Sequence, residues 1–298
     1  MSQYRCLYLI AEPSLQSAAA LQRATALAQA SGAALHILTF FEPTTSMRRL
    51  DQVDQALLRE SALQQCRHWV EEQAAQVRAK GIQVFAEAIC TDDPLEEILI
   101  QIAEQKPDMV IKGAQTESEL LRTFVTPLDW YLLSECPVPV HLVGAIIHPL
   151  PRKVIAAVDV SDTEEQVPGL NQRIIQAANG LALQCNADLH LLYVCDLSSA
   201  HLADALALAW ETDFTEDQRA ALWSAFTAMA ERFSVPLERR HFVVGRTISS
   251  IADFAAQSRA DVIVMGRVQR HGLEKMLGST AEHVLQRVPC SILAVEPG

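Results

Sequence analysis

The sequence predicts two tandem α/β domains, each a five-stranded parallel sheet with helices on both faces. Three observations support this fold class. The halves of the chain repeat each other, short apolar runs alternate with longer helical patterns, and 298 residues are enough for two ordinary domains. Because crossover connections between parallel strands are right-handed, few topologies remain for each half.

The internal repeat appears at three places in the same order. Its members are Lys106-Pro-Asp-Met-Val-Ile-Lys-Gly113 with Arg259-Ala-Asp-Val-Ile-Val-Met-Gly266, Ala33-Ala-Leu-His-Ile-Leu-Thr39 with Ala187-Asp-Leu-His-Leu-Leu-Tyr193, and Cys136-Pro-Val-Pro-Val-His-Leu-Val143 with Val288-Pro-Cys-Ser-Ile-Leu-Ala-Val295. All three pairs share an offset of about 153 residues. We therefore expect a first domain over 1–145 and a second over 152–298, with the linker inside 144–153.

Each copy contains five apolar runs of strand length. In the first copy they are Cys6–Ala11, Leu35–Phe40, Val84–Ile89, Met109–Lys112 and Val138–Val143; in the second they are Val154–Val158, Leu189–Val194, His241–Val244, Val262–Met265 and Ser291–Val295. Helical patterns separate them. Between Ile174 and Cys185, for example, apolar residues recur at spacings of three and four, which predicts one buried helix face.

The helix after the third strand has clear start signals. Asp93-Pro-Leu-Glu96 offers a capping side chain, a proline at the first helical position and a glutamate two residues later. In the second copy we expect Thr247 to cap the equivalent helix.

Composition and charge exclude several classes of protein. Half of the residues are apolar and the net charge is −12, so the chain should fold and should not bind nucleic acid in general. No apolar run has the length of a membrane span, and Met1–Arg5 lacks the order of a signal peptide. The seven cysteines form no CxxC pair and the nine histidines no HxH or HExxH pattern. We expect a cytoplasmic protein with no membrane span and no metal of its own.

A ligand in such a fold binds beyond the carboxyl ends of the strands, where the strand order reverses. In the second copy this position is formed by Asp159 and by the segment 266–282. A carboxylate there can accept hydrogen bonds from ribose hydroxyls or an adenine amino group. Gly278 and Ser279 open the next helix, whose N–H groups favour an anion. Positive charge could come from Arg267, Arg270, His271 and Lys275.

A structural interpretation accounts for the same residues. Ser279-Thr-Ala-Glu282 is also an ordinary capping box. Gly266 could merely end its strand, and Asp159 could cap the following helix. The residues alone leave the nucleotide site and the structural interpretation open.

At this point the sequence resembles the universal stress protein family. The resemblance rests on Val158-Asp-Val-Ser161, on Val264-Met-Gly266 and on Gly278-Ser-Thr-Ala-Glu282, and it covers both copies. The run from Thr126 to Pro137 is similar to tandem members of the family. The resemblance implies an adenine nucleotide alpha hydrolase-like fold with strand order 3-2-1-4-5. It also implies a non-catalytic stress-response protein, pairing of the two halves as an intramolecular pseudo-dimer, and a possible homodimer.

The resemblance further implies ATP in the second copy, with no metal beyond nucleotide-associated Mg²⁺. The residues that would bind the nucleotide are Ala157, Asp159, Val194, Met265, Gly266, Val268, Gly278, Ser279 and Thr280.

Both copies depart from the family pattern Gly-x2-Gly-x9-Gly-Ser/Thr. In the second copy Gln269 replaces the middle glycine, and the loop is one residue short, with Gly272 as partial compensation. In the first copy the pattern positions fall on Gly113, Thr116, Thr126 and Pro127, and Glu12 replaces the aspartate after strand one. Since Pro127 has no N–H to offer an anion, we predict that the first copy does not bind ATP.

Two other functions stay open. The chain could be a scaffold or could bind an apolar, lipid-like ligand, because residues 46–80 and 201–234 carry many alanines and leucines that could enclose a cavity. It could be an enzyme, but the sequence has no GxxxxGK[ST], SGGxDS or GxSxG motif. We therefore expect no catalysis and a small-molecule ligand, either nucleotide or apolar.

Overall fold

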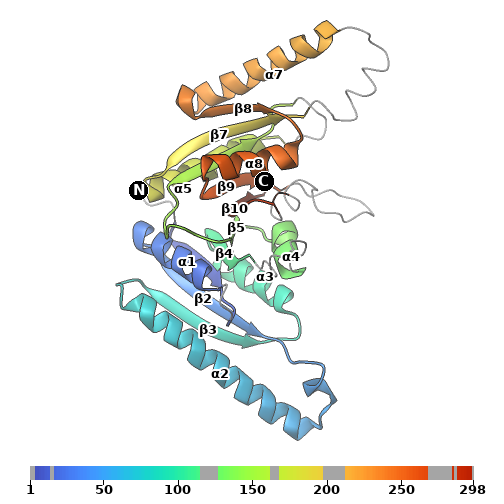
Figure 1. Cartoon of the computed structure of the whole chain (residues 1–298). Helices are drawn as coiled ribbons and strands as arrows, with labels where there is room; N and C mark the ends of the chain where they lie inside the picture. Colours follow the sequence, from blue (N-terminus) through green and yellow to red (C-terminus); the bar gives the residue numbers. More distant parts are fainter. Residues whose placement is uncertain are drawn as a thin grey trace. The chain divides into compact units, whose positions relative to one another are not determined.

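Figure 1 shows the computed structural model of the protein. The structure describes residues 4–13, 17–114, 127–161, 168–196, 212–267, 284 and 287–296. The described residues form two compact units, called unit 1 and unit 2, with the division between Leu150 and Pro151.

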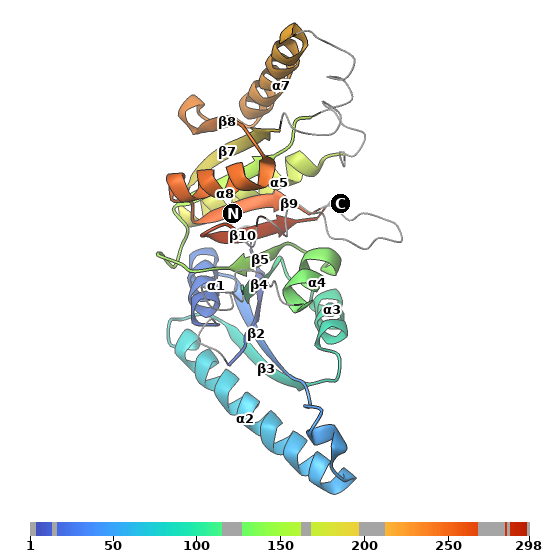
Figure 2. The same ribbon diagram turned by 45° about the vertical axis from the view of Figure 1, so that its right-hand side comes forward.

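Unit 1 contains a five-stranded parallel sheet with strand order β3-β2-β1-β4-β5. Its strands are β1 (Cys6–Ile10), β2 (Ala34–Phe41), β3 (Val84–Cys90), β4 (Met109–Gly113) and β5 (Val140–Val143). Its helices are α1 (Ser17–Ser31), η1 (Met47–Arg49), α2 (Gln52–Arg78), α3 (Pro94–Gln105) and α4 (Pro127–Glu135). Figure 2 shows α1 on one side of these strands and α3 with α4 on the other.

Unit 2 repeats the arrangement with strand order β8-β7-β6-β9-β10. Its strands are β6 (Lys153–Val158), β7 (Asp188–Cys195), β8 (Arg240–Val244), β9 (Val262–Gly266) and β10 (Ser291–Val295). Its described helices are α5 (Leu170–Cys185), α7 (Thr212–Arg232), η2 (Leu237–Arg239) and α8 (Thr247–Ser258). The predicted fold class is confirmed in both units, and the predicted strands differ from the observed ones by at most two residues at an end.

The strands are nearly continuous apolar runs because both faces of a doubly wound sheet are covered. On one face of unit 2, buried residues of β6, β7, β9 and β10 pack with Ile251 and Ala255 of α8 and with Val284. This cluster runs along the strands on that face and reaches their carboxyl ends at Val194 and Met265.

The repeat extends to the backbone conformation. Left-handed residues occur at equivalent places in the two units: Gly32 (φ 72°) and Asn186 (φ 52°), Gly81 (φ 80°) and Ser234 (φ 54°), Lys106 (φ 48°) and Arg259 (φ 53°). Each of them follows a helix that leads into a strand. Glycine at two of the unit 1 positions avoids the steric penalty that the unit 2 residues bear.

An aspartate before the fourth strand of each unit holds the start of the first strand. Asp108 Oδ2 accepts hydrogen bonds from the backbone N–H groups of Arg5 (2.6 Å) and Cys6 (2.9 Å). Asp261 Oδ2 accepts equivalent bonds from Arg152 and Lys153, both at 2.9 Å. The two carboxylates therefore fix the same strand pair, β1–β4 and β6–β9, in both units.

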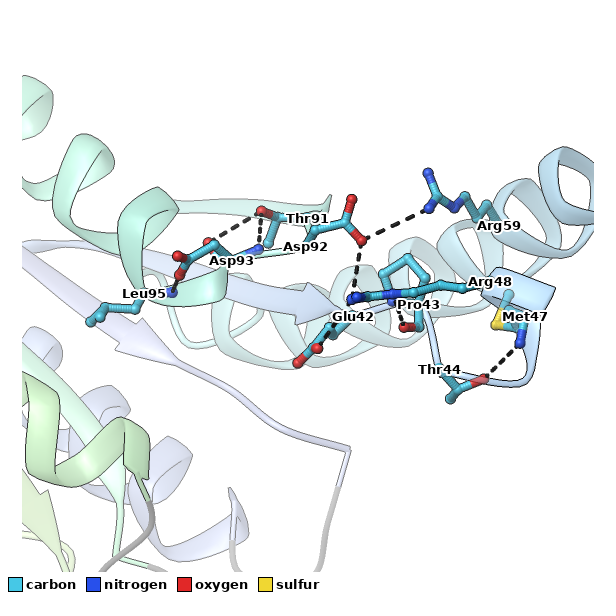
Figure 3. Close-up of polar contacts among 10 residues, drawn as sticks. All are labelled: Glu42, Pro43, Thr44, Met47, Arg48, Arg59, Thr91, Asp92, Asp93 and Leu95. Carbon is cyan, nitrogen blue, oxygen red and sulfur yellow. Dashed lines mark hydrogen bonds and ion pairs between the residues drawn. The ribbon is translucent and has the colours of Figure 1, made fainter. Parts of the chain in front are cut away.

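The predicted start of α3 is confirmed. The Asp93 carboxylate accepts hydrogen bonds from the N–H groups of Leu95 and Glu96, both at 3.1 Å, and Pro94 is the first helical residue. Figure 3 shows this cap beside a group of charged side chains.

Two arginines in that group connect the start of α2 to the β3–α3 turn. Asp92 Oδ1 lies 3.2 Å from Arg48 Nη2 and 3.8 Å from Arg59 Nη2, and Arg48 also pairs with Glu42 at 3.4 Å (Figure 3). Since these side chains are substantially exposed, each pair stabilises the fold only slightly.

The predicted cap of α8 is wrong. Thr247 is the first residue of the helix, and no side-chain cap comes from its N-cap position, Arg246. Instead the carboxylate of Asp196, at the end of β7, accepts bonds from Thr247 N (3.2 Å) and Oγ1 (3.3 Å). A local capping pattern could not reveal an acceptor 51 residues away.

A histidine pair lies between two strands of unit 2. Nδ1 of His190 on β7 is 2.9 Å from Nε2 of His241 on β8, and the rings are stacked. Phe254 of α8 covers His241, with 4.6 Å between ring centroids. Burial, followed by His241 and Lys153, lowers the pKa of His190 to about 4. Burial and Lys153 also lower the pKa of His241.

The histidine pair makes unit 2 sensitive to acid. Below pH 6.5, the ordinary pKa of histidine, the unfolded chain binds protons at these residues but the folded pair does not. The contribution of the pair to the free energy of unfolding is therefore fully present above pH 6.5 and decreases as the pH falls towards 4. The charged groups that act on the pair are Lys153, Arg239 and Asp188.

We expect His190→Gln to reduce the pH dependence of the free energy of unfolding, measured by urea denaturation between pH 7.5 and 4.5, relative to the unsubstituted chain. Parallel pH profiles for the two proteins would contradict this prediction.

Candidate functional site

The carboxyl end of the unit 2 sheet brings together five of the nine predicted nucleotide residues. Val194 of β7 and Met265 of β9 belong to the buried apolar cluster described above, and Ala157 of β6 packs against that cluster. Asp159 and Gly266 follow at the strand ends. Three of these residues therefore form an apolar wall, which suits the flat face of a base but serves equally as core packing.

Asp159 is held by contacts that the sequence did not reveal. Its Oδ1 accepts hydrogen bonds from Ser161 N (2.9 Å) and Ser161 Oγ (2.6 Å), which makes an Asx turn. The amide of Asn171, from the first turn of α5, accepts a bond from Asp159 N at 3.0 Å and donates one to Asp159 O. The exposed carboxylate therefore has a fixed position beside the point where the strand order reverses, between β6 and β9.

Gly266 has a packing role of its own. A Cβ atom at this position would lie 2.7 Å from Leu170 Cδ2 and 2.9 Å from Leu170 Cγ. The glycine therefore lets the start of α5 approach the end of β9. This observation supports the structural interpretation of Gly266 without excluding contact with a ligand.

Arg267 does not supply open positive charge to the site. It is buried, and its Nη2 pairs with Glu296 Oε2 at 3.1 Å at the end of β10. Arg173 Nε of α5 donates to the Glu296 carbonyl oxygen, also at 3.1 Å. The suggestion that Arg267 attracts phosphate is therefore wrong, because its guanidinium is committed to a carboxylate.

The predicted phosphate loop lies outside the described residues. This concerns the nucleotide positions Val268, Gly278, Ser279 and Thr280, together with Gln269, Arg270, His271, Gly272 and Lys275.

Unit 1 fills the equivalent position with its own charges. Lys112, near the end of β4, is 1% exposed, and its Nζ lies 2.8 Å from Asp129 Oδ1 in the first turn of α4. Asp129 is likewise 1% exposed, and Glu12 Oε1 contributes a third charge at 3.1 Å from Nζ. Glu12 is the residue that aligns with Asp159. Its carboxylate therefore faces a lysine of the same chain.

The two units differ in chemistry at these aligned positions. Lys112 aligns with Met265 at an offset of 153, and Asp129 aligns with Ala281 at 152, the offset of the fifth-strand match. A buried ion pair in the first copy thus corresponds to two apolar residues in the second. From the sequence, Lys112 is predicted only as a strand residue. Its position at the end of an apolar run could have indicated a buried charge that needs a partner.

In the part of the chain that the structure describes, no group of three or more His, Cys, Asp or Glu side chains is placed to hold a metal ion. None of the helices described has the length and apolar character needed to cross a membrane.

Two tandem doubly wound units, each with a switch point at the carboxyl ends of its strands, define the class of protein. The model of the universal stress protein family matches residues 5–144 and again 151–296. The chain therefore belongs to the universal stress protein family, and it carries two domains of that family.

Curated relatives agree with this assignment over the whole chain. Universal stress protein E of Salmonella typhi and that of Escherichia coli K12 are each 27% identical over 303 residues, covering 100% of this chain and 96% and 95% of the relatives. Universal stress protein A homolog 1 of Coxiella burnetii is 27% identical over 144 residues, which is 48% of this chain and 95% of that protein.

Solved structures share the fold. A functionally unknown protein of Pseudomonas aeruginosa PAO1 has a TM-score of 0.75 at 24% identity, covering 99% of this chain and 93% of that one. A universal stress protein of Archaeoglobus fulgidus has a TM-score of 0.68 at 18% identity, with 99% and 100% covered.

The ion pair of unit 1 predicts a specific pattern of stability. Lys112→Met leaves Asp129 buried without its counter-charge and should destabilise the chain by about 3–5 kcal/mol. The double variant Lys112→Met/Asp129→Ala, which introduces the aligned residues of the second copy, removes both charges and should be more stable than Lys112→Met. Chemical denaturation of the two variants measures the difference. A double variant that is no more stable than Lys112→Met would contradict this prediction.

Proposed function

We propose that this chain is a non-catalytic stress-response protein that binds an ATP-like nucleotide in unit 2. The observation that carries the proposal is the position of Asp159. Its carboxylate is fixed by Ser161, its backbone is fixed by Asn171, and it stands at the switch point of the sheet. Open α/β sheets bind their ligands at this point.

The surroundings of Asp159 suit the nucleoside part of the ligand. Ala157, Val194 and Met265 place apolar side chains at the strand ends: Val194 and Met265 are buried, and Ala157 is the partly buried one of the three against which a base can lie. An exposed carboxylate beside these residues can accept hydrogen bonds from the two ribose hydroxyls. This combination of apolar side chains with one fixed carboxylate is typical of ligand pockets, which are mostly apolar with a few fixed polar groups.

The proposed binding of the phosphate groups is argued from the sequence. Gly278-Ser279-Thr280 offers backbone N–H groups and two hydroxyls, which suit an anion at the beginning of a helix. The proposal assigns Mg²⁺ only as the counter-ion of the phosphates.

Unit 1 is proposed not to bind ATP. At its switch point the Lys112 ammonium lies between Glu12 and Asp129, so the carboxylate that aligns with Asp159 already has a partner. Pro127 also removes one N–H from the start of α4.

Thermal unfolding with and without Mg-ATP tests the proposal. A ligand present at 100 times its Kd stabilises a protein by about 2.7 kcal/mol, so millimolar ATP should raise the Tm of the chain. Asp159→Ala should remove most of this rise. Glu12→Ala is the matched control: it is the aligned residue in unit 1, and it should keep the ATP-dependent rise whatever it does to the baseline Tm.

No rise in Tm at millimolar Mg-ATP would sink the nucleotide proposal. An equal loss in the Glu12 and Asp159 variants would place the ligand elsewhere.

A second candidate function is the binding of an apolar, lipid-like ligand in unit 2. A groove of about 580 Å³ lies between α7 and the edge strand β8. Its lining consists of the rings of Trp223 and Phe242, whose centroids are 5.3 Å apart, of Ala220 and Val244, and of the charged side chains of Glu216 and Arg219, the second of which could pair with the carboxylate of a fatty acid. Trp223 is 48% exposed, which is high for so large an apolar side chain.

Filling the groove tests this second candidate. Ala220→Phe places a ring in the groove from an exposed position of α7, whereas Ala221→Phe places the same ring on a residue that does not line it. If oleate binds there, calorimetric titration should show affinity reduced about tenfold by Ala220→Phe and unchanged by Ala221→Phe. Equal affinities in all three proteins, or no heat of binding, would exclude this groove.

A further inference from the structure

Unit 1 has a groove that the proposed function does not use. It has a volume of about 450 Å³ and lies on the sheet at the edge strand β3, beside α3. Its lining includes Tyr8, His36 and Phe85 from three adjacent strands, Glu87 from β3, and Gln101 and Gln105 from α3.

The three rings form a continuous aromatic shelf. The centroids of Tyr8 and His36 are 4.9 Å apart, and those of His36 and Phe85 are 4.6 Å apart with the rings stacked. Tyr8 is buried, whereas Phe85 is 48% exposed. The shelf thus runs from the core to the open edge of the sheet, where one ring face is available for stacking.

The polar lining is acidic and amide in character. Glu87 is exposed beside the shelf, and burial lowers the pKa of His36, which keeps that ring neutral at pH 7. Arg78 is the cation among the described lining residues. Its guanidinium donates twice to the Val84 carbonyl oxygen, at 3.2 Å each, and pairs with Glu71. The guanidinium of Arg78 is therefore already bound to β3 and to a carboxylate.

Unit 2 shows what fits at this place. By strand register and helix offset, Glu87 aligns with His241 and Gln101 aligns with Phe254. In unit 2 these two rings lie against each other at a tilt of 48°, with centroids 4.6 Å apart, and His241 stacks on His190, the residue equivalent to His36. Unit 1 keeps the underlying histidine but replaces the two outer rings with a carboxylate and an amide. The space that unit 2 fills with its own rings is therefore open in unit 1.

We propose that the unit 1 groove binds a planar nitrogen heterocycle that carries adjacent N–H donors and no phosphate, of the kind that guanine presents. The ring stacks on the shelf in place of the missing aromatic side chains. The Glu87 carboxylate accepts hydrogen bonds from neighbouring N–H groups of the ring, and the glutamine amides satisfy its remaining edge. A phosphate is disfavoured because the groove offers a carboxylate and a committed arginine.

The experiment uses the full chain and guanosine as the probe, with binding measured by saturation-transfer NMR and by calorimetry. In the Asp159→Ala chain, in which the proposed nucleoside site of unit 2 is removed, guanosine should bind more tightly than adenosine, which lacks the adjacent donors, and more tightly than GMP, which adds charge. Glu87→His/Gln101→Phe introduces the aligned residues of unit 2 and should weaken guanosine binding at least tenfold. Phe85→Ala, at an exposed edge position, should weaken it about tenfold by removing the outer stacking face.

Asp159→Ala separates this groove from the nucleotide site of unit 2, and saturable guanosine binding should persist in that variant. Loss of binding in that variant would assign the nucleoside to unit 2 and overturn the proposal. The proposal is also overturned if guanosine gives no saturable signal, if adenosine binds equally well, or if both groove variants bind guanosine as the unsubstituted chain does.

Discussion

The pairing of the first strand with the fourth is the constraint on which the rest of each unit depends. Asp108 and Asp261 enforce it by accepting two backbone hydrogen bonds each from the residues at which β1 and β6 begin. Once this pair is fixed, the second strand pairs with the free edge of the first, the third strand with the second, and the fifth strand with the free edge of the fourth. The strand order then reverses between the paired strands, which leaves a gap between their connecting loops at the carboxyl ends. Of the described residues proposed for nucleotide binding, Ala157 and Met265 are on the two strands that flank this gap, Asp159 and Gly266 are at their ends, and Val194 is on the neighbouring β7.

The two copies have used the same gap in different ways. In unit 1, Lys112 closes it with two carboxylates of the same chain, and the lysine and Asp129 are almost completely buried. In unit 2 the lysine is replaced by Met265, and Asp159 is held in position by hydrogen bonds with Ser161 and Asn171. A gap that is lined by apolar residues and an exposed carboxylate can accept a ligand. In unit 1 the ion pair already occupies the equivalent place. The opposite exchange occurs on the sheet near β3 and β8, where unit 2 is filled by rings and unit 1 is open.

The sequence was sufficient for the fold because the repeat and the apolar runs act over the whole chain. The ten strands, the helices between them and the α3 cap at Asp93 could be predicted from the local sequence pattern and from the topology rules for parallel sheets. The contacts that define the site could not be predicted in the same way. Asn171 binds Asp159 across 12 residues, Asp196 caps α8 across 51, and Lys112 meets Asp129 only because α4 returns over the end of β4. Arg267 was misinterpreted for the same reason, since its partner Glu296 belongs to another strand.

We propose that unit 2 binds a nucleotide at its switch point, whereas unit 1 fills the equivalent place with an ion pair. The number of ATP molecules bound per chain tests this proposal most directly. Calorimetric titration of the full chain with Mg-ATP should give one site, and the same number should be found for the Lys112→Met/Asp129→Ala variant. Two sites in the unsubstituted chain would contradict the account of unit 1, and none at millimolar ATP would contradict the account of unit 2.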